Sequence, residues 1–267
     1  MSKIIAIANQ KGGVGKTTTS INLGIGLSRA GHKVCLVDFD PQGNATQGLG
    51  YNPDELDYTI STILDKIINK DFNITQDFGI LHHEEGIDLV PSSIDLAVME
   101  MKLLSVYIGR EKILSTYLEM IKSFYDYIII DCKPSLDIIT LNALTAANSV
   151  LIPVQAQYYS AKGLEQLLNT INQVITGGLN THLVIDGIVF TLANDRTNNF
   201  KQVTDIVKDT YGKSVHIFKN YIPRAVTAEE APATGKSIYT YDPEGTVSKA
   251  YSDFTCEFMI REEHMYE

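Results

Sequence analysis

Short, uninterrupted apolar runs alternate along the chain with longer segments in which apolar residues recur every three or four positions. The uninterrupted runs predict strands buried on both faces, as in a parallel sheet, because such strands have no polar side. They are residues 3–8, 33–37, 87–90, 127–130, 149–154, 183–190 and 214–217. We therefore expect a sheet that lies inside the molecule and is covered on both sides.

The helical pattern is clearest in residues 161–175, whose leucines and isoleucines fall on one face before Gly177-Gly178 ends the segment. Further helices are predicted at residues 17–29, 59–68, 94–104, 110–123, 199–210 and 247–260. Strands that alternate with helices indicate an α/β fold, a doubly wound, mostly parallel sheet flanked by helices. No linker or repeat is evident, so we expect a single domain over residues 1–267. The glycine-rich stretch 43–53 follows a strand, and we interpret it as a functional loop.

The charge balance excludes a protein that binds nucleic acid simply through an overall excess of positive charge. Among the 267 residues, 22 are Lys or Arg and 32 are Asp or Glu, a formal net charge of −10. Binding to nucleic acid or to an anionic membrane would need a local basic patch. Cys35, Cys132 and Cys256 are far apart and form no CxxC, which predicts neither a zinc knuckle nor a redox pair. With no apolar stretch long enough for a membrane span, we expect a cytoplasmic protein.

A phosphate-binding loop is indicated between the first strand and the first helix. The run Lys11-Gly12-Gly13-Val14-Gly15-Lys16-Thr17-Thr18 stands in that strand–loop–helix context. Its glycines let backbone N–H groups turn toward phosphate oxygens, and the helix N-terminus adds partial positive charge. Lys16 supplies a charge for the phosphates, and the Thr17 hydroxyl is placed for Mg²⁺. The usual spacing would put a glycine at Gln10; instead Lys11 opens the loop.

The run that starts at Lys11 resembles the deviant Walker A motif of the ParA/MinD class of ATPases. Residues 37–44 resemble the first switch of that class and residues 128–132 its Walker B strand. Residues 152–155, 222–224 and 230–232 resemble later signatures of the class. Nearly the whole chain, about residues 2–258, is similar to ParA/Soj-like partition ATPases.

The resemblance implies a role for each residue of the site, with ATP and Mg²⁺ as cofactors. Lys16 would hold the phosphates, and Lys11 would reach the phosphates of a second copy in a nucleotide-sandwich dimer. Asp40 would orient the attacking water. Asp38 would support the Mg²⁺ shell, and Asp131 would hold Mg²⁺ through water.

The resemblance also implies an adenine pocket formed by residues 191–194 and 222–224. Asn194 would hydrogen-bond the base, Pro223 would pack on its face, and Arg224 belongs to the same turn. For Asn194, an equal alternative is a simple turn residue. The pairs His82-His83 and Tyr158-Tyr159 are interpreted as structural, since adjacent histidines on a strand face opposite ways and make a poor metal site.

Several positions depart from the family pattern. In the second switch, Lys133 stands where the family has a proline and Asp137 where it has a glycine, so we expect a less rigid loop. Basic positions associated with DNA binding are occupied by Thr227 and by residues 244–247. Arg196 remains as the best candidate for contact with DNA.

We therefore expect a Mg²⁺-dependent ATPase that dimerises with ATP and binds DNA nonspecifically on the nucleoid. A ParB-like centromere-binding protein would trigger its ATP hydrolysis. The cargo would be a plasmid, a chromosome or a mobile element. A MinD-like membrane-positioning ATPase is one alternative, but residues 248–267 carry more acidic than basic side chains. An adaptor with negligible turnover is a second alternative. A metal-cluster ATPase is a third, which the absence of a cysteine pair disfavours.

Overall fold

The computed structural model describes the chain except for residues 1, 76, 158–159 and 266–267, and for the side chains of 160–162 and 264–265. Tyr158 and Tyr159 thus lie outside the described residues. Within the described chain, seven strands form one sheet in the order β3-β4-β2-β5-β1-β6-β7. They are β1 (Lys3–Ile7), β2 (Val34–Phe39), β3 (Leu81–His82), β4 (Asp88–Val90), β5 (Tyr127–Cys132), β6 (Ser149–Gln155) and β7 (Val184–Thr191). All neighbouring pairs are parallel except β3 with β4, which confirms the expected doubly wound sheet.

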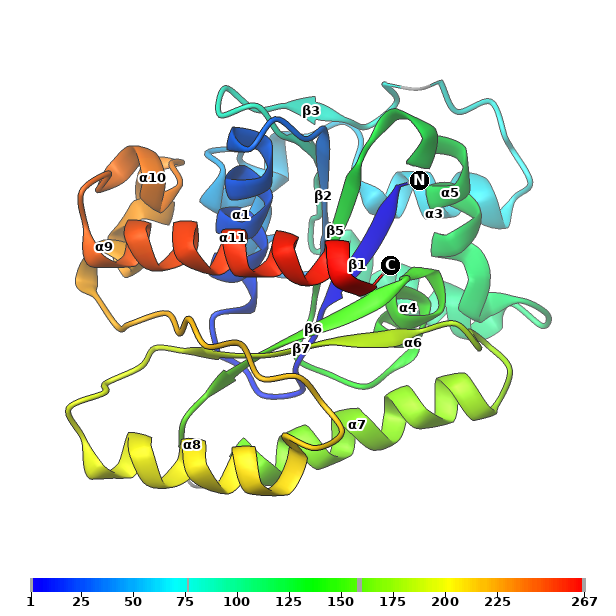
Figure 1. Ribbon diagram of the computed structural model, residues 1–267. Coiled ribbons are helices and arrows are strands. Elements are labelled where there is room, and N and C mark those ends of the chain that lie inside the picture. Colours follow the sequence, from blue (N-terminus) through cyan, green and yellow to red (C-terminus); the bar gives the residue numbers. More distant parts are fainter. Residues whose placement is uncertain (1, 76, 158–159, 266–267) are drawn as a thin grey trace.

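Helices cover both faces of this sheet (Figure 1). They are α1 (Lys16–Arg29), α2 (Asn44–Gly48), α3 (Ile60–Ile68), α4 (Asp95–Ser105), α5 (Ile113–Ile121), α6 (Ile138–Ala146), α7 (Ser160–Thr176), α8 (Asn198–Tyr211), α9 (Val226–Glu230), α10 (Ile238–Tyr241) and α11 (Thr246–Met265). Single 3₁₀ turns lie at Pro53–Glu55, Arg110–Lys112, Lys122–Phe124 and Ala231–Thr234.

Successive side chains of the central strands enter two separate cores, which explains the uninterrupted apolar runs. Ile4 and Ala6 of β1 belong to the core that is closed by α3 to α8. Ile5 and Ile7 belong to the core on the opposite face, which is closed by α1, α10 and α11. A strand with a core on each side needs apolar residues at every position.

Several elements differ from the sequence expectation, among them α6, α9 and α10, which were not predicted. The predicted strand at 214–217 is not one: it meets β7 only at an isolated bridge between Ile217 and Ile188. Further along the chain, the backbone N–H groups of Lys219 and Asn220 donate to a carboxylate of α11, and a second isolated bridge joins Pro223 to Ala193, beyond the end of β7. The short strand β3 was not predicted, and the loop at 43–53 contains the five-residue helix α2.

A buried cation ties the start of β1 to the C-terminal helix. The Lys3 ammonium lies 2.8 Å from Asp186 Oδ1 of β7 and also pairs with Glu262 of α11. Burial raises the pKa of Glu262, and the hydrogen bond from Lys3 opposes that rise. The edge of the sheet and the last helix are therefore held together by a buried lysine and two buried carboxylates that neutralise one another.

We predict that Lys3→Met destabilises the protein by about 3–5 kcal/mol, because two buried carboxylates lose their cation. A carboxyl group with a raised folded-state pKa contributes stability that is lost as the pH rises through that pKa. Without Lys3 only the weaker effect of the Arg261 charge opposes the rise in the Glu262 pKa, so the loss of stability should be larger at pH 8 than at pH 5. Urea unfolding at both values measures it. Lys249→Met, which removes an exposed lysine 3.8 Å from Glu244, is the matched control and should change little.

Candidate phosphate site

The loop between β1 and α1 presents its backbone to open space. Gly13 and Gly15 have φ of 69° and 77°, in the left-handed region that favours glycine. A Cβ atom at Gly12 or Gly13 would meet no atom within 4 Å. The Thr191 hydroxyl of β7 donates to the Val14 carbonyl at 2.7 Å and pins the underside of the loop. The result is a cradle of backbone N–H groups at a helix N-terminus, which suits an anion.

Lys16 is held at the first turn of α1 with only 7% of its surface exposed. Its ammonium donates to the Lys11 carbonyl at 3.2 Å. Burial lowers the pKa of Lys16, and the charge of Asp131 opposes that shift. A desolvated ammonium next to an open cradle is an incomplete charge pair, and a phosphate group would complete it.

Asp38 and Asp131 lie side by side at the carboxyl ends of β2 and β5, where they are register partners. Both are almost fully buried, with 0% and 1% of their surface exposed. Burial, together with the charge of Asp131, raises the pKa of Asp38 to about 7. Burial raises the pKa of Asp131 to about 6, against the hydroxyls of Thr17 and Ser20.

The two carboxylates have different partners. Asp38 accepts hydrogen bonds from the backbone N–H and the hydroxyl of Thr46 at 2.8 and 2.7 Å. Its second oxygen accepts from the Asp40 N–H at 3.3 Å. Asp131 accepts from the Ser20 hydroxyl at 2.8 Å with one oxygen, whereas its buried Oδ2 has no hydrogen-bond partner in the described chain. Asp38 thus fixes the first switch and α2, and Asp131 keeps an oxygen available.

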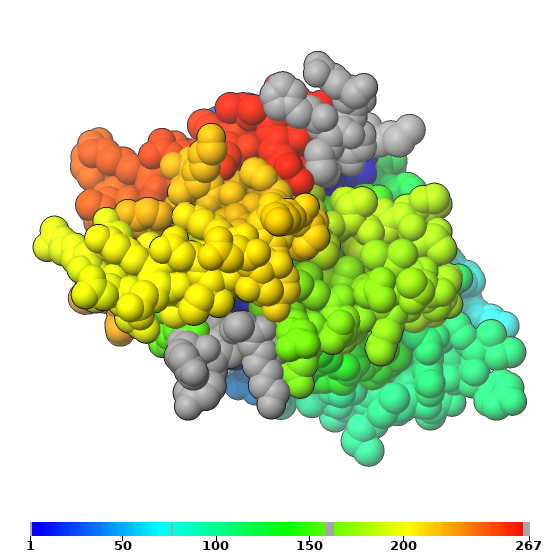
Figure 2. All heavy atoms as spheres, turned by 60° about the horizontal axis from the view of Figure 1, so that its bottom comes forward, coloured from blue at the N-terminus to red at the C-terminus, as the bar shows by residue number. Residues whose placement is uncertain are grey.

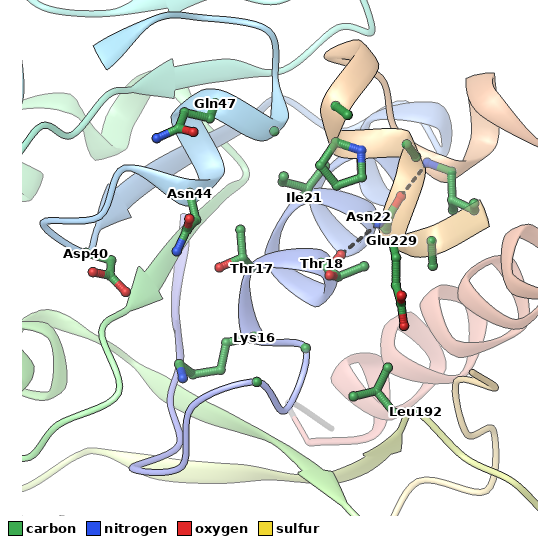
Figure 3. Close-up of a pocket in the computed structure, with 18 of the residues that line it drawn as sticks. Lys16, Thr17, Thr18, Ile21, Asn22, Asp40, Asn44, Gln47, Leu192 and Glu229 are labelled. Atoms are coloured by element: carbon green, nitrogen blue, oxygen red, sulfur yellow. Dashed lines mark hydrogen bonds between the residues drawn. The ribbon is translucent and has the colours of Figure 1, made fainter. Parts of the chain in front are cut away.

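A cavity of about 570 Å³ opens over the loop. Figure 3 shows Lys16, Asp40 and Asn44 on one side and Leu192 and Glu229 on the other, with the start of α1 between them. Of the residues predicted for the site, those that line it are Gly12, Gly13, Gly15, Lys16, Thr17, Thr18 and Asp40. Asp38, Asp131 and Val14, the loop residue between Gly13 and Gly15, are buried and do not line the cavity.

Lys11 is not among the described residues that line this cavity. Its ammonium instead contacts the Gln157 side-chain oxygen, and its backbone N–H donates to Asn9 at 2.9 Å. Lys11 therefore points away from the phosphate cradle of its own chain.

The predicted base pocket is only adjacent to the cavity. Asn194, Pro223 and Arg224 are not among the described lining residues. The Asn194 carbonyl accepts from the Thr197 N–H and hydroxyl, which matches the alternative of a turn residue. Arg224 reaches the rim through Glu229, 3.3 Å away. Their contact with adenine stays a prediction.

The far wall of the cavity is formed mostly by residues to which the sequence analysis gave no individual role, although Leu192 lies within the predicted adenine-pocket segment 191–194. The wall contains Leu192, Ala228, Glu229, Ala231, Pro232, Ala233, Lys236 and Ile238. Asn22 of α1 links this wall to the loop, because it accepts from the Ile238 N–H at 3.0 Å and donates to the Thr18 carbonyl at 2.8 Å. The signature at 230–232 and the predicted segment 191–194 were the sequence signals that pointed to this wall.

The residues present fit a magnesium nucleotide. The open cradle and the buried ammonium of Lys16 suit phosphates, and Thr17 and the orphaned Asp131 Oδ2 are oxygen donors of the kind that Mg²⁺ prefers. In the described chain no group of three or more His, Cys, Asp or Glu side chains could hold a metal ion. Magnesium bound here would therefore take most of its ligands from phosphate and water.

Charged side chains hold the second-switch loop, which we expected to be less rigid than in the family. Lys133 lies 2.6 Å from both Glu100 of α4 and Asp137. Asp137 in turn caps α6, because it accepts from the backbone N–H groups of Ile139 and Thr140. Ion pairs and a helix cap thus restrain a loop that lacks the constraint of the missing proline.

Arg196 lies on the exposed turn before α8. Its neighbour Asp195 accepts a hydrogen bond from the Tyr221 hydroxyl at 2.8 Å. In the part of the chain that the structure describes, Arg196 forms no ion pair. Its guanidinium is exposed and accessible to a polyanion.

Comparison with known proteins gives a consistent assignment. A family model described as an AAA domain matches residues 2–185. The sporulation initiation inhibitor protein Soj of Bacillus subtilis is 47% identical over 257 residues, which cover 96% of this chain and 98% of that protein. The chromosome partitioning protein ParA of Myxococcus xanthus is 42% identical over 264 residues, with coverages of 98% and 89%.

Solved structures agree on the fold. Cobyrinic acid a,c-diamide synthase from Mycobacterium smegmatis, with bound ATP analogue and magnesium, superposes with a TM-score of 0.83 at 34% identity over 96% of this chain and 93% of its own. A putative plasmid partition protein from Borrelia burgdorferi, bound to AMPPNP, gives 0.78 at 25% identity over 98% and 100%. Given the identity to Soj and ParA over nearly its whole length, the chain belongs to the ParA/Soj family of P-loop partition ATPases.

Proposed function

We propose that this chain acts as a single ATPase domain that binds Mg²⁺–ATP and hydrolyses it to switch its own dimerisation in DNA partitioning. The observation that carries the proposal is the cavity itself. It joins an open backbone cradle, the buried Lys16 ammonium and Asp40, with the unpartnered Asp131 oxygen behind it. The diamide synthase structure with bound ATP analogue and magnesium, and the plasmid partition protein bound to AMPPNP, support the choice of ligand.

Each residue has a distinct task in this proposal. The backbone of residues 12–15 and Lys16 hold the phosphates. Thr17 and Asp131 would hold Mg²⁺, which neutralises charge on the phosphates when it is bound. Asp40, the one acidic side chain of the first switch that faces the cavity, positions water for attack. Asp38 acts indirectly, since its hydrogen bonds to Thr46 keep the first switch in place.

Dimerisation would place a second cation at the γ-phosphate. Lys11 does not line its own cavity, which favours a role toward the phosphates of a second copy. A cation supplied in trans stabilises the charge that develops during phosphoryl transfer. Because only the triphosphate offers this contact fully, ATP and ADP would favour different assembly states.

The output we propose is DNA segregation on the nucleoid, with a ParB-like centromere-binding protein as the activating partner. Similarity to Soj and ParA supports this output over the reaction of the diamide synthase, because this chain is more identical in sequence to Soj and ParA than to the synthase at similar coverage. A membrane-positioning role has less support, because it would need a basic amphipathic helix and residues 248–267 carry more acidic than basic side chains. In the described chain no helix is long and apolar enough to cross a bilayer. The adaptor with negligible turnover is distinguished by steady-state hydrolysis.

Substitutions at Lys16 and Asp40 separate binding from chemistry. Lys16→Ala should abolish tight ATP binding, because the phosphates lose their buried cation. Asp40→Ala should bind ATP with nearly unchanged affinity but lose turnover by about 10²-fold or more, because water positioning acts in the transition state. Fluorescent-nucleotide titration and phosphate release measure the two effects. Turnover at the wild-type rate in Asp40→Ala would show that the role assigned to Asp40 is wrong.

The assembly state should follow the nucleotide. With Mg²⁺–ATP the protein should dimerise, and with ADP it should be mainly monomeric. Asp40→Ala should accumulate the ATP dimer, whereas Lys11→Ala should fail to form it while still binding ATP. Light scattering coupled to gel filtration measures the mass. A single mass in both nucleotide states would rule out the switch.

DNA binding should be weak and confined to the ATP dimer, because a chain of net charge −10 must rely on a few local cations. Each phosphate contact adds about −0.9 to the slope of log affinity against log salt, so the slope should be shallow. Arg196→Ala should weaken binding about equally on unrelated duplexes, and Thr227→Arg should strengthen it. A salt titration on random DNA tests both. A steep slope that Arg196→Ala leaves unchanged would place the basic patch elsewhere.

A further inference from the structure

The loop from Cys132 to Asp137 is held at both ends by charged side chains. At its start, the Lys133 ammonium sits between a carboxylate of α4, Glu100, and one at the start of α6, Asp137, 2.6 Å from each. At its end, Asp137 uses its other oxygen, Oδ1, to accept from the N–H groups of Ile139 and Thr140 at 3.0 and 3.4 Å. One side chain therefore joins the loop, α4 and α6.

We propose that Lys133 is the positioning residue of this loop. Its bridge between Glu100 and Asp137 holds Pro134 in place as part of the wall of the nucleotide cavity and fixes the conformation of the backbone that follows Asp131. The inference rests on the proposed ATPase function and deepens it. Lys133 touches neither phosphate nor metal in this proposal; it acts through the loop.

The bridge has the surroundings of a structural ion pair. The Lys133 side chain is 14% exposed, and the carboxylates of Glu100 and Asp137 are 25% and 28% exposed. Burial by itself lowers the pKa of Lys133, but the bonds to both carboxylates outweigh it and raise that pKa. Partial burial makes the attraction stronger than that of a surface pair, because water screens it less.

The loop is short enough for the bridge to matter at the cavity. Asp131 lies two residues before Lys133. Pro134, which lines the cavity, is the residue directly after Lys133. The Ser135 N–H donates to the Lys133 carbonyl at 2.9 Å, which closes a tight turn around Pro134. The Thr140 hydroxyl donates to the Ser135 carbonyl at 2.9 Å. A shift of the Lys133 side chain is therefore transmitted to the cavity wall through a few covalent bonds.

Loss of the cation should do more than remove an attraction. Without the ammonium, Glu100 and Asp137 would face each other as like charges across the loop, which favours their separation. If Glu100 is neutralised as well, that repulsion disappears. The double substitution should therefore be milder than the single one, a non-additivity that simple loss of packing does not produce.

The test compares Lys133→Met with Lys133→Arg, with Glu100→Gln/Lys133→Met and with Lys102→Met. Lys102 is the matched control, because it lies on α4, the helix that carries Glu100, and pairs with Asp65 rather than with the loop. We expect Lys133→Met to lower kcat for ATP about ten-fold, with KM changed less than two-fold, as expected for a transition-state effect. Lys133→Arg and the double variant should recover most of that loss, and Lys102→Met should match the wild type.

Amide hydrogen exchange gives a readout that does not depend on turnover. In Lys133→Met the amides of Ser135 and Leu136 should exchange about ten-fold faster, while those of β5 stay protected. If the wild type hydrolyses no ATP but the exchange effect appears, the proposed function fails and the positioning role stands. If Lys133→Met leaves both kcat and exchange unchanged, or if the double variant is as impaired as the single one, the positioning role is overturned.

Discussion

The arrangement of the site depends on the burial of carboxylates next to a buried cation where parallel strands end. Asp38 and Asp131 are register partners on β2 and β5, and Lys16 opens the helix that follows β1. Burial raises the pKa of both acids and lowers that of Lys16. Groups in such a position are tolerated only when each has a partner. The phosphate loop, the first switch and α1 are arranged so that these charges meet one another or a ligand.

The partners of these charges also explain why the loops of the site are ordered. Thr46 of α2 satisfies Asp38, and Ser20 of α1 satisfies one oxygen of Asp131. The Thr46 hydroxyl accepts in turn from the Ser92 N–H, which joins the chain before α4 to the same network. The first switch and the start of α1 are thus fixed by the acids at the strand ends, and one acidic oxygen remains for a ligand.

The departures from the family pattern act in different ways. Lys133 forms ion pairs with both Asp137 and Glu100, so an electrostatic constraint stands where a proline would have supplied a conformational one. Thr227 and residues 244–247 show no comparable compensation: Glu244 has Lys249 at 3.8 Å, an exposed pair. The second switch is therefore held by ion pairs, whereas a weakened basic surface at Thr227 and residues 244–247 stays a prediction.

The sequence alone determined what adjacent residues encode. The phosphate loop, its flanking strand and helix, and the uninterrupted strands of a two-sided sheet are local patterns, and the structure agrees with the loop and with six of the seven predicted strand runs. The tertiary structure decided the contacts between distant segments. Thr46 on Asp38, Glu100 on Lys133, and a cavity wall built from Leu192 and Lys236 all depend on strand order and register. The segment at 214–217 shows the same limit: its composition favoured a strand, but it meets β7 only at an isolated bridge, and just beyond it the N–H groups of Lys219 and Asn220 donate to a carboxylate of α11.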